Sequence, residues 1–294
     1  MNLRRFLPAI VLLLFATSSH AQLDVRVEIE RANYVSYEAI PATVTITNTS
    51  GADIVLGGPN GTPWLNFIIN YESGKPVAGL ANISANPMMC RAGETLQRRY
   101  NLPRFYHLID SGGYVIKASV YFADLSRWVN SRPARFTVTL APKPRWEKTV
   151  ALPANHKMVG KYRRYQVFYF NDIHRSYIYS RVIDESTGAI IQTMPLSYVE
   201  ADRTFQPAID LSQNLHILYL GSPKIWVHMI INPDGGVVSQ KFRKQTQGEV
   251  TLVTQRGGLL AIAGGEPYDP TEKKPVSPGP ASVKRLSDRP VGVE

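Results

Sequence analysis

The feature that most constrains the fold of this chain is a two-residue alternation of apolar and polar side chains. In residues 23–31, Leu23, Val25, Val27 and Ile29 are apolar, and charged residues separate them. This alternation is typical of a half-buried β-strand, because successive side chains point to opposite faces of a sheet. Further short strands are predicted at 40–47, 53–56, 64–71, 94–102, 114–122 and 135–140. Short strands separated by turn residues predict an all-β fold, here a β-sandwich.

A tyrosine that follows a glycine turn sharpens this prediction. The segment Asp110-Ser-Gly-Gly-Tyr114 leads directly into the strongly apolar run 115–120. A tyrosine at the start of a late sandwich strand can form a tyrosine corner, in which its hydroxyl bonds to backbone a few residues upstream. We therefore expect the Tyr114 hydroxyl to contact nearby backbone.

Residues 23–142 resemble the immunoglobulin-like domains of bacterial exported proteins, in particular the proteinase-inhibitor-like type. The segments that carry the resemblance are 42–50, 64–68, 92–96 and 113–118. The resemblance implies an N-terminal immunoglobulin-like β-sandwich. By likeness alone it also implies proteinase inhibition as an alternative function, although no segment matches a reactive inhibitory loop.

A proline-containing break at residues 141–145 ends this first region. Pro142 and Pro144 favour extended backbone and do not fit a central strand, so we predict the domain boundary there. The second domain is predicted over 146–266. Residues 267–294 are rich in proline and poor in apolar side chains, and are predicted to be a disordered tail.

The second region carries an internal repeat. Residues 178–192 and 226–240 share one pattern, an apolar strand, a glycine-containing turn and a second strand, and both read as hairpins. Hairpin repeats of about 40–50 residues are typical of propeller blades, but a closed propeller needs at least about four blades. We therefore predict an antiparallel β domain of two pseudo-repeats, as a compact sandwich or half-barrel, or else a partial array completed by a partner. No family is suggested for this region.

The first 21 residues have the layout of a secretory signal peptide. Arg4 and Arg5 precede an apolar run over 6–15, and Ser19 and Ala21 occupy the small-residue positions of a cleavage site after Ala21. The run is shorter than the ~20 residues that span a bilayer. The sequence has no lipobox cysteine and no later apolar span. It therefore predicts a periplasmic or extracellular protein without a lipid anchor or a membrane span.

Cysteine content and charge limit the remaining function classes. Cys90 is the only cysteine, so no internal disulfide can form, and its apolar setting predicts a buried small side chain. The formal net charge is +10, but lysine and arginine are scattered along the chain. Scattered basic residues indicate a solvated surface rather than a nucleic-acid-binding arm, and no nucleic-acid partner is expected.

Few residues suggest catalysis. No Gly-x-Ser-x-Gly elbow or phosphate-binding loop in a strand-to-helix setting is present. His216 and His228 flank a short turn and fall directly opposite each other if Leu220 pairs with Lys224, a register that a one-residue slip destroys. An alternative function, a metal-dependent hydrolase or metalloprotein, rests on four residues: Asp172, His174, His216 and His228.

Tyrosine and arginine crowd the second region, and both are enriched at recognition hot spots. The candidate binding residues are Arg164, Tyr169, Arg175, Tyr177 and Tyr179. An alternation that places Tyr165, Val167 and Tyr169 on one face allows a core role instead. The leading hypothesis is a non-catalytic binding or structural module, without a cofactor, that contacts a protein or glycan of the cell envelope or exterior.

Overall fold

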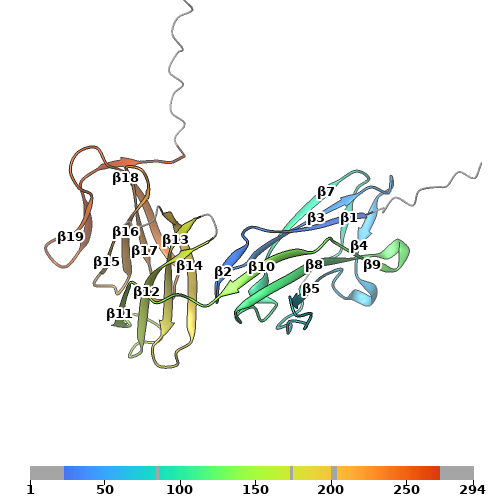
Figure 1. The fold of residues 1–294 in the computed structure, drawn as a ribbon, viewed down its shortest axis with the longest axis horizontal. Helices are drawn as coiled ribbons and strands as arrows, with labels where there is room; N and C mark the ends of the chain where they lie inside the picture. The colour runs from blue at the N-terminus through green and yellow to red at the C-terminus, as the bar shows by residue number, and fades with distance from the viewer. Residues whose placement is uncertain (1–22, 84–85, 173–174, 200–203, 272–294) are drawn as a thin grey trace, which may run out of the picture. The chain divides into compact units, whose positions relative to one another are not determined.

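The computed structural model describes residues 23–83, 86–172, 175–199 and 204–271, and within these ranges the protein is all-β (Figure 1). Regular structure consists of β-strands and a few short 3-10 turns, with no α-helix among the described residues. The all-β prediction is confirmed. The predicted signal peptide (1–21) and residues 272–294 of the predicted tail lie outside the described residues.

The chain divides into two compact units. The first contains residues 1–151 and 160–198, and the second contains residues 152–159 and 199–294. This division does not coincide with the predicted boundary at 141–145, because part of the second predicted domain belongs to the first unit. The predicted domains 23–142 and 146–266 stay a prediction.

The N-terminal part of the first unit contains two larger sheets and one small one. An antiparallel sheet has the order β1 (Leu23–Ile29), β3 (Pro41–Asn48), β7 (Thr95–Asn101). A second has the order β2 (Asn33–Val35), β10 (Ala134–Thr139), β8 (Gly112–Phe122), β5 (Leu65–Tyr71), with β9 (Arg127–Asn130) also paired to β8. The small sheet pairs β4 (Ile54–Leu56) with β6 (Met88–Cys90).

The predicted alternation explains how these sheets form a core. Along β3 every second residue is buried, ending at Asn48. One hydrophobic cluster draws on β1, β3, β5, β8 and β10 together, so the apolar faces of both larger sheets contribute to it. Cys90 is buried and free, as predicted. The immunoglobulin-like type of this region stays a prediction.

The Tyr114 hydroxyl donates a hydrogen bond to the Asp110 carbonyl oxygen at 2.7 Å, which confirms the predicted backbone contact. The buried Tyr114 ring stacks on Phe136, with ring centroids 5.2 Å apart. The turn before β8 is thereby attached to the core.

A further sheet of the first unit follows the chain order β11 (Trp146–Ala151), β12 (Tyr162–Asn171), β13 (Ser176–Asp184), β14 (Ile190–Val199). The second unit has the order β15 (Phe205–Ile209), β16 (Leu215–Ser222), β17 (Ile225–Ile231), β18 (Val237–Lys244), β21 (Glu266–Tyr268). It also contains the pair β19 (Thr251–Thr254) and β20 (Leu260–Ala263).

Both predicted hairpins are present, one in each unit. Residues 178–192 lie in β13, its turn and β14, and residues 226–240 lie in β17, its turn and β18. The tail prediction was wrong at its start. Pro267 and Tyr268 belong to β21, because they pair with Arg243 and Phe242 of β18.

Candidate functional site

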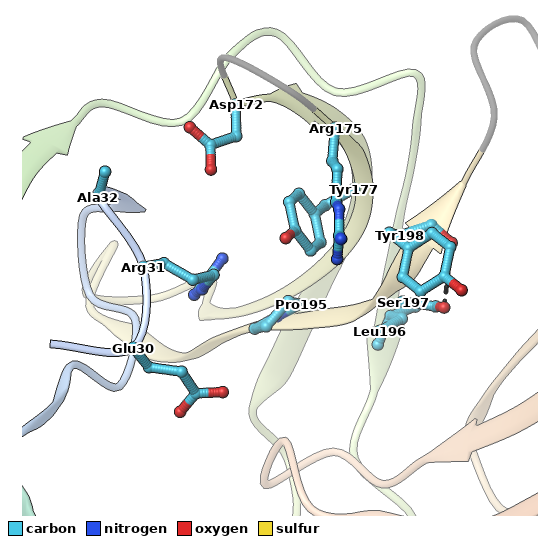
Figure 2. A pocket seen from close by; sticks show the side chains of 10 residues that line it. All are labelled: Glu30, Arg31, Ala32, Asp172, Arg175, Tyr177, Pro195, Leu196, Ser197 and Tyr198. Carbon is cyan, nitrogen blue, oxygen red and sulfur yellow. Dashed lines mark hydrogen bonds between the residues drawn. The ribbon is translucent and has the colours of Figure 1, made fainter. Parts of the chain in front are cut away.

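The first unit contains a pocket of about 850 Å³ (Figure 2). Its walls come from the segment after β1, the residues around the start of β13 and the end of β14. The lining residues are Glu30, Arg31, Ala32, Asp172, Arg175, Tyr177, Pro195, Leu196, Ser197 and Tyr198. Two of the five predicted binding residues, Arg175 and Tyr177, are therefore in its wall.

One face of β13 explains how these segments meet. Tyr177, Tyr179 and Arg181 alternate along the strand and so point to the same side of the sheet. All three contact the segment 31–38: the Arg31 guanidinium lies 5.3 Å from the Tyr177 ring centroid and donates to the Tyr179 hydroxyl at 2.8 Å. Arg181 donates to the Ser36 carbonyl oxygen at 3.0 Å. These contacts hold the segment 31–38 against β13, and both contribute residues to the pocket wall.

Arg31 is held by a buried network of charged and polar groups. Its guanidinium forms an ion pair with Glu38, whose residue is only 2% exposed. The Tyr179 hydroxyl accepts from Arg31 and donates to Glu38 Oε2 at 3.0 Å, and Glu38 Oε2 also accepts from the Val35 amide at 3.0 Å. The Arg31 guanidinium also lies over the Tyr34 ring, 4.6 Å from its centroid. Arg31, Glu38 and Tyr179 thus satisfy one another's buried polar groups.

Burial also fixes the protonation state of Tyr179. Removal from water raises its pKa to about 12, against the opposing charge and hydrogen bond of Arg31. The hydroxyl therefore keeps its proton near neutral pH and continues to donate to Glu38.

The opposite side of the pocket wall carries Arg175 and Tyr198. The Arg175 guanidinium lies 5.4 Å from the Tyr198 ring centroid, within cation–π range. Tyr198 is 51% exposed, and the Ser197 hydroxyl donates to its carbonyl oxygen at 3.0 Å. Figure 2 shows Arg31, Tyr177 and Arg175 along the wall, Tyr198 beyond Arg175, and Asp172 and Glu30 at opposite ends of the view.

The structure separates the other three predicted binding residues from this wall. Tyr179 is fully buried beneath it, so its proposed role as a surface contact was wrong. Tyr169 pairs with Ile178 and therefore points to the opposite face of the sheet from Tyr177 and Tyr179, where it lines a smaller pocket with Arg145. Arg164 shares the Tyr177 face but forms an ion pair with Glu185 at 3.2 Å.

Arg31 and Tyr198 are among the pocket residues that the sequence analysis did not select as candidates. Arg31 comes from the end of the first strand segment and meets β13 only in the folded chain. Tyr198 belongs to the tyrosine-rich region, which was the available signal for it.

The alternative metal site of Asp172, His174, His216 and His228 stays a prediction. His174 lies outside the described residues, and Asp172 belongs to the first unit whereas His216 and His228 belong to the second. No group of three or more His, Cys, Asp or Glu side chains in the described part of the chain is placed to hold a metal ion.

His216 and His228 nevertheless contact each other. His216 Nδ1 lies 3.0 Å from His228 Nε2, and His216 Nε2 lies 3.1 Å from Asp210 Oδ2. His216 pairs with Ile230 and His228 with Leu218, so the predicted register was wrong by two residues. A two-residue shift keeps side chains on the same face, and the histidines therefore meet diagonally across the strands.

Burial controls the charge of this pair. His228 is 4% exposed, and burial together with the nearby charges of His216 and Lys241 lowers its pKa to about 4. Burial alone raises the pKa of Asp210, but hydrogen bonds from Asn214 and the contact with His216 outweigh it and leave the pKa below its usual value. His228 is therefore neutral at neutral pH.

No protein-family model matches this chain, and no curated protein matches it. Among solved structures, it is similar to the alkylpurine DNA glycosylase AlkC of Pseudomonas fluorescens bound to DNA containing an abasic site analog (TM-score 0.29, 14% identity, 41% of this chain and 31% of that chain). It is also similar to the sporulation control protein Spo0M of Bacillus subtilis (TM-score 0.28, 10% identity, 58% of this chain and 83% of that chain). The chain thus spans under a third of the AlkC chain, and both likenesses are too low to indicate a shared fold or function.

Within the described ranges, no helix has the length and apolar character needed to cross a bilayer.

Proposed function

We propose that this protein is an exported, non-catalytic binding module that contacts a protein or glycan of the cell envelope or exterior through the pocket in Figure 2. The observation that carries the proposal is the gathering of Arg31, Arg175, Tyr177 and Tyr198 in one pocket wall. Arginine and tyrosine combine a large contact area with directed hydrogen bonds. Both are enriched among the few interface residues that contribute most of the binding free energy. The pocket volume also falls in the range of about 300–1,000 Å³ that is typical of ligand sites.

Preorganisation of the wall supports recognition. Arg31 is fixed by Glu38 and Tyr179 beneath the surface, and the Tyr177 ring packs against its guanidinium. A side chain that is already ordered loses less conformational entropy when a ligand binds. The wall is therefore ready to bind without rearrangement.

The layout of residues 1–21 supports export, which places the ligand in the envelope or outside the cell. The test of location is the N-terminal sequence of the protein recovered from cell fractions. Cleavage after Ala21 in an exported fraction supports the proposal, and an uncut chain retained in the cytoplasm contradicts it.

The binding test uses the chain from Gln22 onward against arrays of peptides and glycans. Tyr198→Ala removes an exposed ring from the pocket, whereas Tyr162→Ala removes an equally exposed ring (53%) that does not line it. We expect a ligand whose affinity falls at least tenfold in Tyr198→Ala, as at a hot spot, and is unchanged in Tyr162→Ala. The absence of any ligand, or equal loss in both variants, contradicts the proposal.

A further inference from the structure

Arg175 is the positively charged group of the pocket that has no carboxylate partner among the described residues. Arg31 is paired with Glu38, and Glu30 is paired with Arg99. Asp172 accepts a hydrogen bond from the Asn33 side-chain amide. Among the described residues, Arg175 has the Tyr198 ring as its side-chain partner and no carboxylate within ion-pair distance. This guanidinium is therefore available to a ligand.

The position of Arg175 suits a carboxylate. A guanidinium that packs against an aromatic ring keeps the N–H groups along its edge for hydrogen bonding. Those N–H groups form a planar fork that matches the two oxygens of a carboxylate. The Tyr198 ring thus supports a ready-made anion contact at the pocket wall.

The remainder of the lining indicates what else the ligand carries. Asp172 and Glu30 place carboxylate acceptors in the same pocket, and Tyr177 and Tyr198 contribute ring surface. Ionised carboxylates accept hydrogen bonds and have no proton to donate. They therefore suit a ligand with several hydroxyl groups, and aromatic rings suit one with an apolar C–H face.

From these contacts we infer that the pocket takes a saccharide that contains a uronic acid, with the sugar carboxylate on Arg175 and sugar hydroxyls on Asp172 and Glu30. The inference rests on the proposed binding function and names its ligand class. An acidic peptide brings a carboxylate for Arg175 but no hydroxyl groups that donate hydrogen bonds to Asp172 and Glu30. A phosphate group carries up to two negative charges and a uronate carries one, so Asp172 and Glu30 repel the phosphate more strongly.

The test is isothermal titration calorimetry at fixed ionic strength with the full mature chain. The probes are trimers of galacturonate, mannuronate and glucuronate, each matched with its carboxyl-reduced neutral counterpart, and a hexaglutamate peptide. We expect at least one uronate trimer to bind roughly tenfold more tightly than its neutral counterpart, because a charge-assisted contact is lost on reduction. Hexaglutamate is expected to bind no better than the neutral sugar.

Arg175→Gln provides the matched variant. It is expected to weaken uronate binding roughly tenfold and to leave binding of the neutral sugar unchanged. Arg256→Gln removes an exposed arginine of the second unit and is expected to change neither. Arg175 is itself exposed in a turn, so an unchanged unfolding transition verifies that the variant is folded.

The outcomes separate this inference from the proposed function. Equal affinity for uronate and neutral sugars, or no effect of Arg175→Gln, overturns the inference but leaves the pocket a binding site. Tighter binding of hexaglutamate than of every uronate trimer also overturns it and favours a protein ligand. Failure of the uronate trimers to bind overturns it, and failure of all probes together with the peptide and glycan arrays overturns the proposed function as well.

Discussion

Two buried polar clusters, one in each compact unit, accommodate buried ionisable groups in different ways. In the first unit Arg31 and Glu38 keep opposite charges, and the Tyr179 hydroxyl bridges them. In the second unit His216 and His228 contact each other, and burial keeps His228 neutral. Pairing a buried charge and losing it are two ways to lower the cost of burial, and these clusters provide one example of each.

The clusters also differ in what they connect. The histidines lie on adjacent strands, β16 and β17, and join neighbours in the chain. The Arg31–Glu38–Tyr179 cluster joins segments far apart in sequence and forms the base of a pocket wall. The comparison indicates that the charged cluster specifies the position of the pocket wall, whereas the neutral one completes a local core.

Glu38→Gln is expected to give the largest effect. It keeps the size of the side chain but leaves the Arg31 charge largely buried without its counter-ion, which costs about 3 kcal/mol of unfolding free energy. Urea denaturation measures the change. Glu28→Gln, at an exposed position, is the control and is expected to change stability by less than about 0.5 kcal/mol. A loss below about 1 kcal/mol for Glu38→Gln contradicts a tightly coupled pair.

Acid is expected to act mainly on the histidine cluster. The pKa of His228 is about 4 in the folded protein and 6.5 without the fold, so the unfolded chain binds more protons between these values. Stability from this group is therefore fully present above pH 6.5 and falls by about 1–3 kcal/mol as the pH drops toward 4.

The pH dependence of urea unfolding measures this effect, and His228→Gln is expected to flatten the profile in that window. A profile of the wild-type protein that is already flat between pH 6.5 and 4 contradicts a buried neutral His228.

Tyr179→Phe is expected to have a smaller effect than Glu38→Gln. It removes one hydrogen bond to each of Arg31 and Glu38 while their ion pair remains, so the expected loss is about 1–2 kcal/mol of unfolding free energy. Tyr162→Phe, at an exposed tyrosine, is the control. Equal free energies of unfolding for Tyr179→Phe and the wild type contradict a stabilising role of the Tyr179 hydroxyl at the pocket wall.

Tyr198→Ala is expected to have the smallest effect on stability. Its ring is half exposed and contacts the Arg175 guanidinium, so the change in unfolding free energy is expected to be below about 0.5–1 kcal/mol. Thermal unfolding measures it. A loss above about 2 kcal/mol indicates that Tyr198 belongs to the core rather than to the pocket.

The sequence predicted the elements whose pattern is local. The alternation in β1 and β3 and the hydroxyl contact of Tyr114 follow from neighbouring residues, and all were found as expected. β2 was missed because three residues carry too little periodicity, and its parallel pairing with β10 depends on tertiary contacts.

The candidate site was predictable only in part, for the same reason. Arg175 and Tyr177, which line the pocket, were candidates because tyrosine and arginine are concentrated around β13. Arg31 has no such local signal, because Tyr177 and Tyr179, which it contacts, lie far from it in the sequence. Tyr169 was misplaced because the pairing of β12 with β13 puts it opposite Ile178, on the other face of the sheet from Tyr177. The sequence alone does not show this register.

The central claim is that the pocket of the first unit is a binding site. The most direct test takes the peptide or glycan that binds the wild type most tightly in the arrays. Calorimetry then measures its dissociation constants for Tyr198→Ala and Tyr162→Ala. We predict that Tyr198→Ala binds at least tenfold more weakly than Tyr162→Ala, which matches the wild type. Equal dissociation constants for the two variants contradict the claim.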